Sequence, residues 1–214
     1  MTLMTDKTET VILIHGLWMR GLVLLPHQHW LRAEGFAVRR FSYPSWRGGL
    51  ADNARLLSSL VNETPGNVIH LVAHSLGGLV ALKMLSREPD ARIRRVVLLG
   101  TPYAGCHCGF TLAALPVLGA LVGRTFEDCF SLPRPALQPA VEIGVIAGTR
   151  PIGFGRLIPG LARPNDGLVA VDETRIAAAR DSISLNVSHS GMLVSRACAG
   201  QIANFLRTGS FIHG

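Results

Sequence analysis

Short apolar runs alternate along the chain with segments in which apolar residues recur at helical spacing. The runs have the length of buried parallel strands, and several lead directly into Gly, Ser or His. Helical spacing is clearest for Leu50, Ala54, Leu57 and Val61. The pattern predicts strands at residues 11–14, 37–43, 68–73, 95–100, 141–147 and 183–187. It predicts helices at 26–35, 50–61 and 79–85, and a closing helix with Val194, Cys198, Ile202 and Phe205 on one face.

Strands that alternate with helices predict an α/β fold with a doubly wound, mostly parallel sheet of about six strands, flanked by helices. We see no internal repeat or dividing linker, so residues 1–214 are expected to form a single domain. Residues 103–139 are interrupted by Pro and Gly and are predicted to form a small cap or irregular insertion after the fourth strand.

The sharpest reversal in the predicted fold lies between the third strand and its helix, at residues 73–77 (Ala-His-Ser-Leu-Gly). This is a nucleophile elbow with Ala in the first Gly position. A Ser on so tight a turn has strained backbone angles, and the residues two before and two after it are forced together. Ala73 and Gly77 leave that room, and Gly78 lets the helix pack close to the sheet. The turn therefore predicts an exposed Ser75 hydroxyl at the N-terminus of a helix.

A serine hydroxyl needs a base to take its proton and a third group to orient that base. His189 follows the last strand in a short loop, so it is the candidate base. The other histidines fit less well. His15 and His74 sit in motifs whose backbone is needed elsewhere, His27 and His29 fall on a predicted surface helix, His70 is mid-strand, and His107 and His213 lie in irregular segments.

The orienting acid should come from another loop at the same edge of the sheet. Asp166, between the fifth and sixth strands, is the candidate, and it gives the order Ser, Asp, His of this motif class. Asp172 and Glu173 are competitors because the loop lengths are not fixed by the sequence. Two other acids, Glu142 and Asp181, begin or precede strands and belong at the opposite edge.

The oxyanion of a tetrahedral intermediate needs two or more donors about 3 Å away. We expect the backbone N–H groups of Leu76, after the nucleophile, and Leu17, after the first strand, to supply them.

Composition narrows the function classes. The chain has 214 residues, of which 48% are apolar and 16% charged, with a net charge of +7. The basic residues are scattered, so we expect no nucleic-acid partner. No apolar leader is visible and no run reaches the roughly 18 residues of a membrane span, so a cytoplasmic protein without a transmembrane segment is expected. No metal-ligand spacing is present, although a disulfide between Cys106 and Cys129 stays open.

Five motifs occur in one order: Val-Ile-Leu-Ile-His-Gly-Leu, Ala-His-Ser-Leu-Gly-Gly, Leu-Leu-Gly-Thr-Pro-Tyr-Ala-Gly, Asn-Asp-Gly-Leu-Val and Val-Ser-His-Ser-Gly-Met-Leu. Over residues 11–206 the chain resembles the α/β-hydrolase superfamily, in particular its small bacterial lipases and esterases. The resemblance implies a minimal α/β-hydrolase fold that lacks two early strands. It also implies hydrolysis of carboxylic esters, including lipid esters, through a Ser75 acyl-enzyme, with no metal or organic cofactor.

The substrate is expected to be a small-molecule ester or lipid, with Trp18, Met19 and Phe110 as candidate binding residues. Plain core packing is the alternative for each of them. The same triad would also serve an acyltransferase, a thioesterase or a lipid deacylase. Two further alternatives are a non-catalytic binding protein of the same fold and a module that contacts membrane surfaces through its basic charge and residues 110–122.

Overall fold

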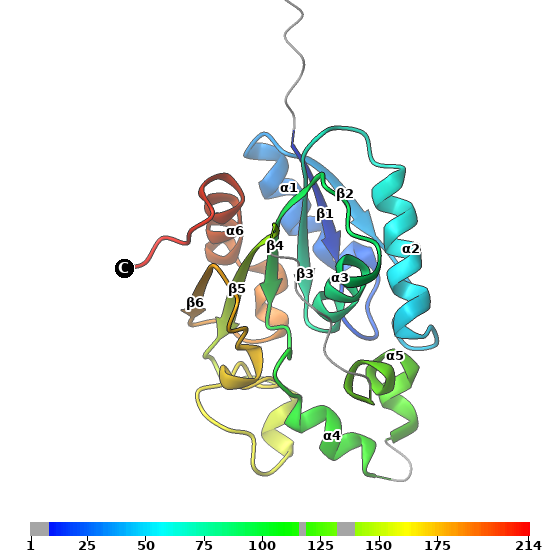
Figure 1. The fold of residues 1–214 in the computed structure, drawn as a ribbon. Helices are drawn as coiled ribbons and strands as arrows, with labels where there is room; N and C mark the ends of the chain where they lie inside the picture. Colours follow the sequence, from blue (N-terminus) through cyan, green and yellow to red (C-terminus); the bar gives the residue numbers. More distant parts are fainter. Residues whose placement is uncertain (1–8, 116–118, 132–139) are drawn as a thin grey trace, which may run out of the picture.

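The structure, a computed structural model, describes residues 9–115, 119–131 and 140–214. Its strands form one six-stranded sheet in the order β2-β1-β3-β4-β5-β6, and every neighbouring pair is parallel (Figure 1). The strands are β1 (Thr10–Ile14), β2 (Ala37–Phe41), β3 (Ile69–His74), β4 (Ile93–Leu99), β5 (Glu142–Gly148) and β6 (Asp181–Leu185). This is the minimal α/β-hydrolase fold, and all six predicted strands are confirmed with ends shifted by a few residues.

Helices cover both faces of this sheet. The α-helices are α1 (Leu25–Ala33), α2 (Leu50–Asn62), α3 (Leu76–Arg87), α4 (His107–Ala113), α5 (Gly119–Ser131) and α6 (Arg196–Thr208). The short 3-10 helices are η1 (Gly21–Leu24), η2 (Phe154–Leu157), η3 (Asp172–Thr174) and η4 (Ser190–Val194). Within the described ranges, no helix is long and apolar enough to cross a bilayer.

The core has two halves because successive side chains of a strand point to opposite faces of the sheet. In β1, Ile12 and Ile14 pack in the half that contains α2 and α3, whereas Val11 and Leu13 pack in the half that contains α1 and α6. All four side chains are fully buried. Strands buried on both faces therefore appear in the sequence as continuous apolar runs.

Two expectations about the helices are wrong. Val194 does not join the buried face of the closing helix: it ends η4 and is largely exposed. Ser195 separates η4 from α6. Its hydroxyl accepts a 3.2 Å hydrogen bond from the Cys198 N–H and caps the N-terminus of α6. His27 is not on a surface, since it is fully buried in α1, whereas its neighbour His29 is exposed.

The carboxyl ends of the strands meet at the lower edge of the sheet in Figure 1, above α4, α5 and the loop that follows β5. The strand order changes direction at β1. The second strand, β2, pairs with one side of β1, and the third, β3, pairs with the other side. Ligand sites in open parallel sheets form at such a switch point. The predicted cap 103–139 contributes α4 and α5 here, and its residues 116–118 and 132–139 lie outside the described ranges.

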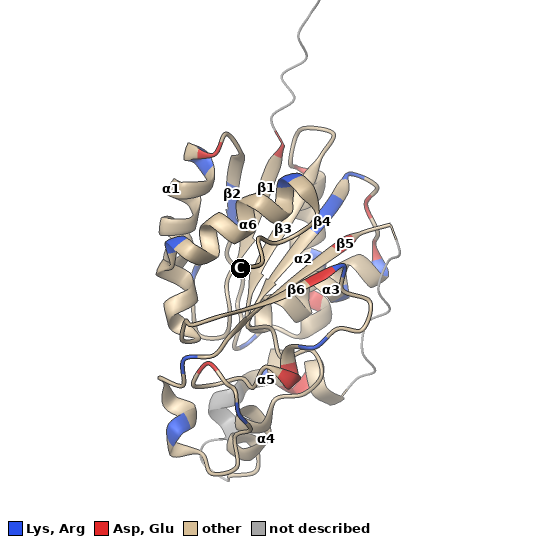
Figure 2. Cartoon of the chain, turned by 90° about the vertical axis from the view of Figure 1, so that its left-hand side faces the viewer, with Lys and Arg blue, Asp and Glu red and all other residues tan. Residues whose placement is uncertain are grey.

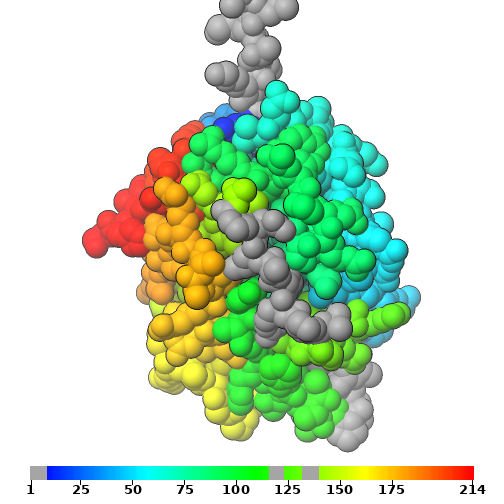
Figure 3. Space-filling view, viewed as in Figure 1, coloured from blue at the N-terminus to red at the C-terminus, as the bar shows by residue number. Residues whose placement is uncertain are grey.

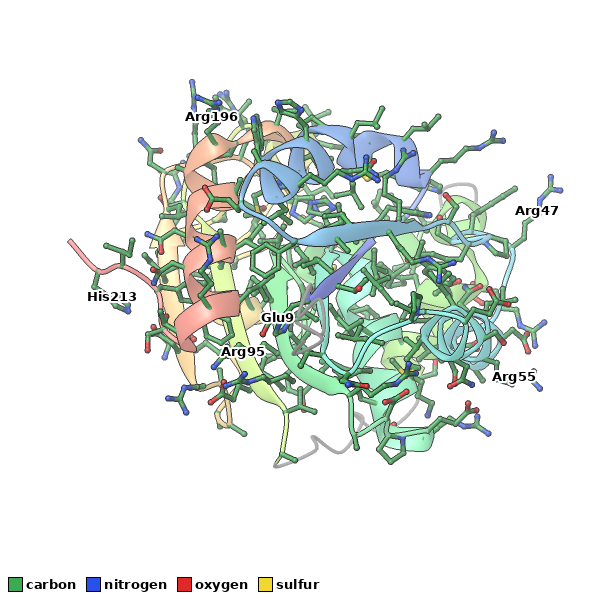
Figure 4. The ribbon with its side chains drawn as sticks, turned by 90° about the horizontal axis from the view of Figure 1, so that it is seen from above. Glu9, Arg47, Arg55, Arg95, Arg196 and His213 are labelled. Carbon is green, nitrogen blue, oxygen red and sulfur yellow. The ribbon has the colours of Figure 1, made fainter. Side chains whose placement is uncertain are left out.

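The edge of the sheet at which the strands begin is seen from above in Figure 4, and it carries ion pairs. Arg95 of β4 bonds Glu142 of β5 at 2.6 Å, and Glu142 also pairs with Arg180 at 2.8 Å. Asp181, at the start of β6, accepts from the Phe211 N–H at 2.7 Å. Glu142 and Asp181 therefore lie at the edge away from Ser75, as predicted.

Candidate active site

Ser75 occupies the turn between β3 and α3. Its φ of 54° and ψ of −128° place a non-glycine residue in a region that L-amino acids rarely adopt. The backbone holds this angle from both sides, because the Ser75 N–H donates to the Leu99 carbonyl at 2.8 Å and α3 begins at the next residue. The predicted elbow is thus present in the backbone.

The small residues after Ser75 are required by close packing. A Cβ atom added to Gly77 would lie 2.9 Å from Ile14 Cγ2 and 3.1 Å from the carbonyl carbon of His15. One added to Gly78 would lie 2.6 Å from Thr101 Cγ2. Carbon atoms normally approach to about 3.5–4.0 Å. Glycine at both positions therefore lets α3 start against the end of β1 and the segment after β4.

His189 and Asp166 are joined twice. The His189 Nδ1 atom lies 2.7 Å from Asp166 Oδ2, and the His189 N–H donates to the Asp166 carbonyl at 2.8 Å. Asp166 Oδ1 accepts from the N–H groups of Leu168 and Val169 at 2.9 and 2.7 Å. The carboxylate is buried and accepts at both oxygens, so Nδ1 of a neutral His189 carries the proton and Nε2 is left as an acceptor.

The competing acids are engaged elsewhere. Asp172 is exposed and forms an ion pair with Arg175 at 2.8 Å. Glu173 accepts from the Ala170 N–H at 2.8 Å and also from the backbone of His107. Of the candidate acids, Asp166 is the one that contacts His189.

Two buried histidines hold the loop that carries His189. His74 Nε2 lies 3.0 Å from the His189 carbonyl, and His27 Nε2 lies 2.7 Å from the Met192 carbonyl. A carbonyl oxygen only accepts, so both rings are protonated at Nε2. Burial lowers the pKa of His27, and it lowers the pKa of His74 well below 6.5, where repulsion from a protonated His189 would lower it further. Both rings are therefore neutral donors that position the loop.

The sequence analysis did not predict that His74 and His27 position the loop that carries His189. The signal for His27 was its spacing, since Leu24, His27, Gln28 and Leu31 share one face of a helix and all are buried. For His74, the only clue in the sequence was its position next to Ser75.

The loop after β1 is fixed next to Ser75 by the side chain of His15. Tyr43 donates its N–H to His15 Nε2 at 3.3 Å and its hydroxyl to the His15 carbonyl at 2.9 Å, while the two rings stack 4.4 Å apart. His15 Nδ1 is then the protonated nitrogen, and it donates to the Gly16 carbonyl at 2.8 Å. Burial raises the pKa of Tyr43, so its hydroxyl keeps the proton that it donates. The next residues, Leu17 and Trp18, reach the same cavity as Ser75.

That cavity has a volume of about 240 Å³ and a mostly apolar wall. Ser75 and His189 both line it, as do Leu17 and Leu76, the two predicted oxyanion donors. The rest of its wall includes Trp18, Met19, Pro102, Cys106, Leu112, Phe126, Phe154 and Leu168. The structure therefore brings together residues that follow β1, β3, β4 and β5 with the His189 loop.

Phe110 is placed differently from Trp18 and Met19. It is not among the lining residues, its side chain is about half exposed, and its ring meets those of Phe126 and Phe130 edge-on at 6.1 and 5.0 Å. Phe110 therefore supports the cavity wall from behind Phe126.

The cysteines are buried thiols, and Cys106 and Cys129 are not joined by a disulfide. Burial raises the pKa of Cys106 to about 12 and that of Cys108 to about 11. In the part of the chain that the structure describes, no cluster of three His, Cys, Asp or Glu side chains could hold a metal ion.

Comparison with known proteins agrees with this geometry. The model of the Alpha/beta hydrolase family matches residues 11–205, so the chain belongs to the α/β-hydrolase family. Comparison with curated protein sequences gave no match.

Several solved structures share the fold. A mature lipase from Bacillus licheniformis has a TM-score of 0.74 and 18% identity, with 94% of this chain and 91% of the lipase covered. A metagenomic carboxyl esterase has a TM-score of 0.69 and 21% identity, with 86% and 65% covered. A carboxylesterase from Bacillus subtilis has a TM-score of 0.62 and 13% identity, with 94% and 84% covered. At these identities the likeness describes the fold alone.

Proposed function

We propose that the protein is a serine hydrolase of carboxylic esters, of the lipase or esterase type, with Ser75 as nucleophile, His189 as base and Asp166 as the orienting acid. The observation that carries the proposal is the bond between His189 Nδ1 and Asp166, which leaves Nε2 free to accept a proton in the cavity that Ser75 also lines. The family membership and the esterase-like neighbours support the same reaction class.

The reaction proceeds in two halves. The Ser75 oxygen attacks the ester carbonyl carbon while its proton passes to His189 Nε2, and the carbonyl oxygen becomes an oxyanion that accepts from the N–H groups of Leu17 and Leu76. The oxyanion collapses, the carbon–oxygen bond to the alcohol breaks, and His189 returns the proton to the departing alkoxide. Water then attacks the Ser75 acyl ester by the same route and releases the carboxylic acid.

The apolar wall around Ser75 favours acyl groups without charge. Trp18 and Met19 are the proposed acyl contacts because they line the cavity beside the oxyanion loop. Phe110 acts through Phe126, whose ring lies on the cavity wall.

The test is hydrolysis of p-nitrophenyl esters from acetyl to palmitoyl by the wild type and by Ser75→Ala. We expect the substitution to lower kcat by more than about 10⁴-fold and to leave the urea unfolding midpoint unchanged. The matched control is Ser190→Ala, because Ser190 lines the same cavity and the proposed mechanism gives its hydroxyl no part. Labelling of Ser75 by a fluorophosphonate gives a second readout.

A Ser75→Ala protein that keeps its esterase rate would contradict the assignment. A wild type that reacts with the fluorophosphonate but hydrolyses no ester would contradict the hydrolase reaction, and added alcohols or thiols would then test acyl transfer. A wild type that neither reacts nor hydrolyses would favour a binding protein.

A further inference from the structure

A second cavity lies in the loop that connects β5 to the turn of Asp166. This loop, residues 149–165, contains Arg150, Arg156 and Arg163 and has no Asp, Glu or Lys. We call it the arginine loop. It forms the lower left of the fold and of the molecular surface, next to α4 (yellow in Figures 1 and 3). Figure 2 turns this side toward the viewer and shows blue positions among the loops below the sheet.

The cavity has a volume of about 570 Å³, and all three arginines line it. Its wall contains no acidic residue, and its other members include Gly155, Gly160 and Asn165. In the described part of the chain none of the three guanidinium groups forms an ion pair or a side-chain hydrogen bond. Like charges gathered without a counterion repel one another, so the cavity fits an anion.

Some other arginines of the chain are paired with acidic residues. Arg92 pairs with Asp90 at 2.6 Å, and Arg207 pairs with Glu34 at 2.8 Å. Arg87 and Arg94 also form no ion pair among the described residues, so what distinguishes the arginine loop is that three such groups line one cavity without an acidic residue. A guanidinium presents a planar set of donors that matches the oxygens of a phosphate group, so phosphate is the anion that three such groups would bind best.

Exposed apolar side chains alternate with these arginines. Leu157 is 77% exposed, Phe154 is 54% exposed and Ile152 is 50% exposed. A soluble anion would need no such side chains, whereas a lipid surface offers phosphate groups at the depth of the headgroups and apolar chains just below them. Phe154 also lines the catalytic cavity, so this face of the loop borders the opening through which an ester would reach Ser75.

We propose that the arginine loop binds the phosphate headgroups of an anionic phospholipid surface. Arg150, Arg156 and Arg163 take the phosphate oxygens in the 570 Å³ cavity, while Leu157 and Ile152 enter the boundary between headgroups and acyl chains. The catalytic cavity then faces the lipid. Docking does not require the chemistry proposed at Ser75.

The test measures co-sedimentation with vesicles of phosphatidylcholine alone and of phosphatidylcholine with 30% phosphatidylglycerol. All proteins carry Ser75→Ala, so binding is read without hydrolysis, and a failure here is separate from a failure of the proposed reaction. The loop variant combines Arg150→Gln, Arg156→Gln and Arg163→Gln. The control combines Arg55→Gln, Arg87→Gln and Arg94→Gln, which removes the same charge away from the loop; Arg55 projects outward from α2 in Figure 4.

We expect the wild-type loop to bind the anionic vesicles and to lose binding in high salt. The loop variant should bind about 100-fold more weakly, since each arginine near an anionic surface contributes about a fivefold change, and the control should lose much less. Arg156→Gln alone should cost about fivefold if the triple variant is unstable. Leu157→Ser should weaken binding about tenfold, whereas Leu56→Ser, at an exposed leucine of α2, should not.

Three results would overturn the proposal. If the loop variant and the control lost vesicle binding to the same extent, net charge alone would explain the loss. Equal binding to neutral and anionic vesicles would remove the role of phosphate. Saturable binding of inorganic phosphate at millimolar concentration, together with no effect of Leu157→Ser on the vesicles, would assign the cavity to a free anion.

Discussion

Replacement of Gly77 by alanine tests whether the first turn of α3 sets the position of the oxyanion loop. The added methyl group would lie 2.9 Å from Ile14 Cγ2 and 3.1 Å from the His15 carbonyl carbon, and closer still to the His15 carbonyl oxygen. Normal carbon contacts begin at about 3.5 Å, so the helix and the end of β1 must separate by at least about 0.6 Å. Two of the three obstructing atoms belong to the backbone, which cannot rotate away.

The size of the effect follows from this rigidity. Overpacking in a core usually costs about 1–3 kcal/mol, and backbone obstruction puts Gly77→Ala near the upper end. A loss of about 3 kcal/mol would lower Tm by roughly 6–12 °C in a domain of this size. The displaced residues lead into Leu17, the proposed oxyanion donor, and the loss of one such donor costs about 10²–10³-fold in kcat. We therefore expect a fall of about 100-fold in kcat.

The assay combines urea unfolding with the kinetics of p-nitrophenyl butyrate hydrolysis. Gly200→Ala is the matched control, because Gly200 lies in α6 and an added Cβ would meet no atom within 4 Å. Alanine there should raise the free energy of unfolding by about 0.5–1 kcal/mol and leave kcat unchanged. If Gly77→Ala had the stability and kcat of the wild type, the close packing of α3 against β1 would not position the site.

Three further predictions concern other parts of the site. Asp166→Asn should lower kcat about 10⁴-fold, whereas Asp172→Asn should change it by less than about threefold; the reverse result in the same ester assay would reassign the acid. The raised pKa values of Cys106 and Cys108 predict alkylation by iodoacetamide at pH 8 at least about 100-fold more slowly in the native than in the urea-unfolded protein, and equal rates by mass spectrometry would argue against their burial. Because the pKa of His74 is lowered on folding, the unfolded chain binds a proton below pH 6.5 that the native protein does not, so the free energy of unfolding should fall as pH drops below 6.5. His74→Gln should reduce that slope in urea titrations at pH 5–8, and an unchanged slope would exclude His74 as a source.

The inner strands of the sheet could be predicted from the sequence because burial on both faces leaves an apolar run in each of them, whereas the edge strands β2 and β6 are only partly buried and contain polar residues. The elbow could be predicted as well, since the close contacts of Gly77 and Gly78 allow little else at those positions. Asp166 followed from its place after the fifth strand, although only the folded chain shows which acid contacts His189.

The remainder depends on contacts between distant segments. His74 and His189 are 115 residues apart in sequence, and nothing local to either residue reports their bond. His27 was predicted to lie on a surface helix, whereas its side chain is fully buried and has one hydrogen bond, to the Met192 carbonyl. The side of α4 that faces the cavity depends on how the helices below the sheet pack together. The sequence around Phe110 therefore could not predict where its side chain lies relative to the cavity.

The double link between Asp166 and His189 has a consequence for how the enzyme could be regulated. The backbone bond persists whatever the protonation of the imidazole, so the acid and the base move as one body. The arginine loop bonds that body through the Gly155 N–H and the Gly167 carbonyl, which lie 2.7 Å apart. A force applied to the loop would therefore shift the pair relative to Ser75 without separating its members. Such a shift would change kcat.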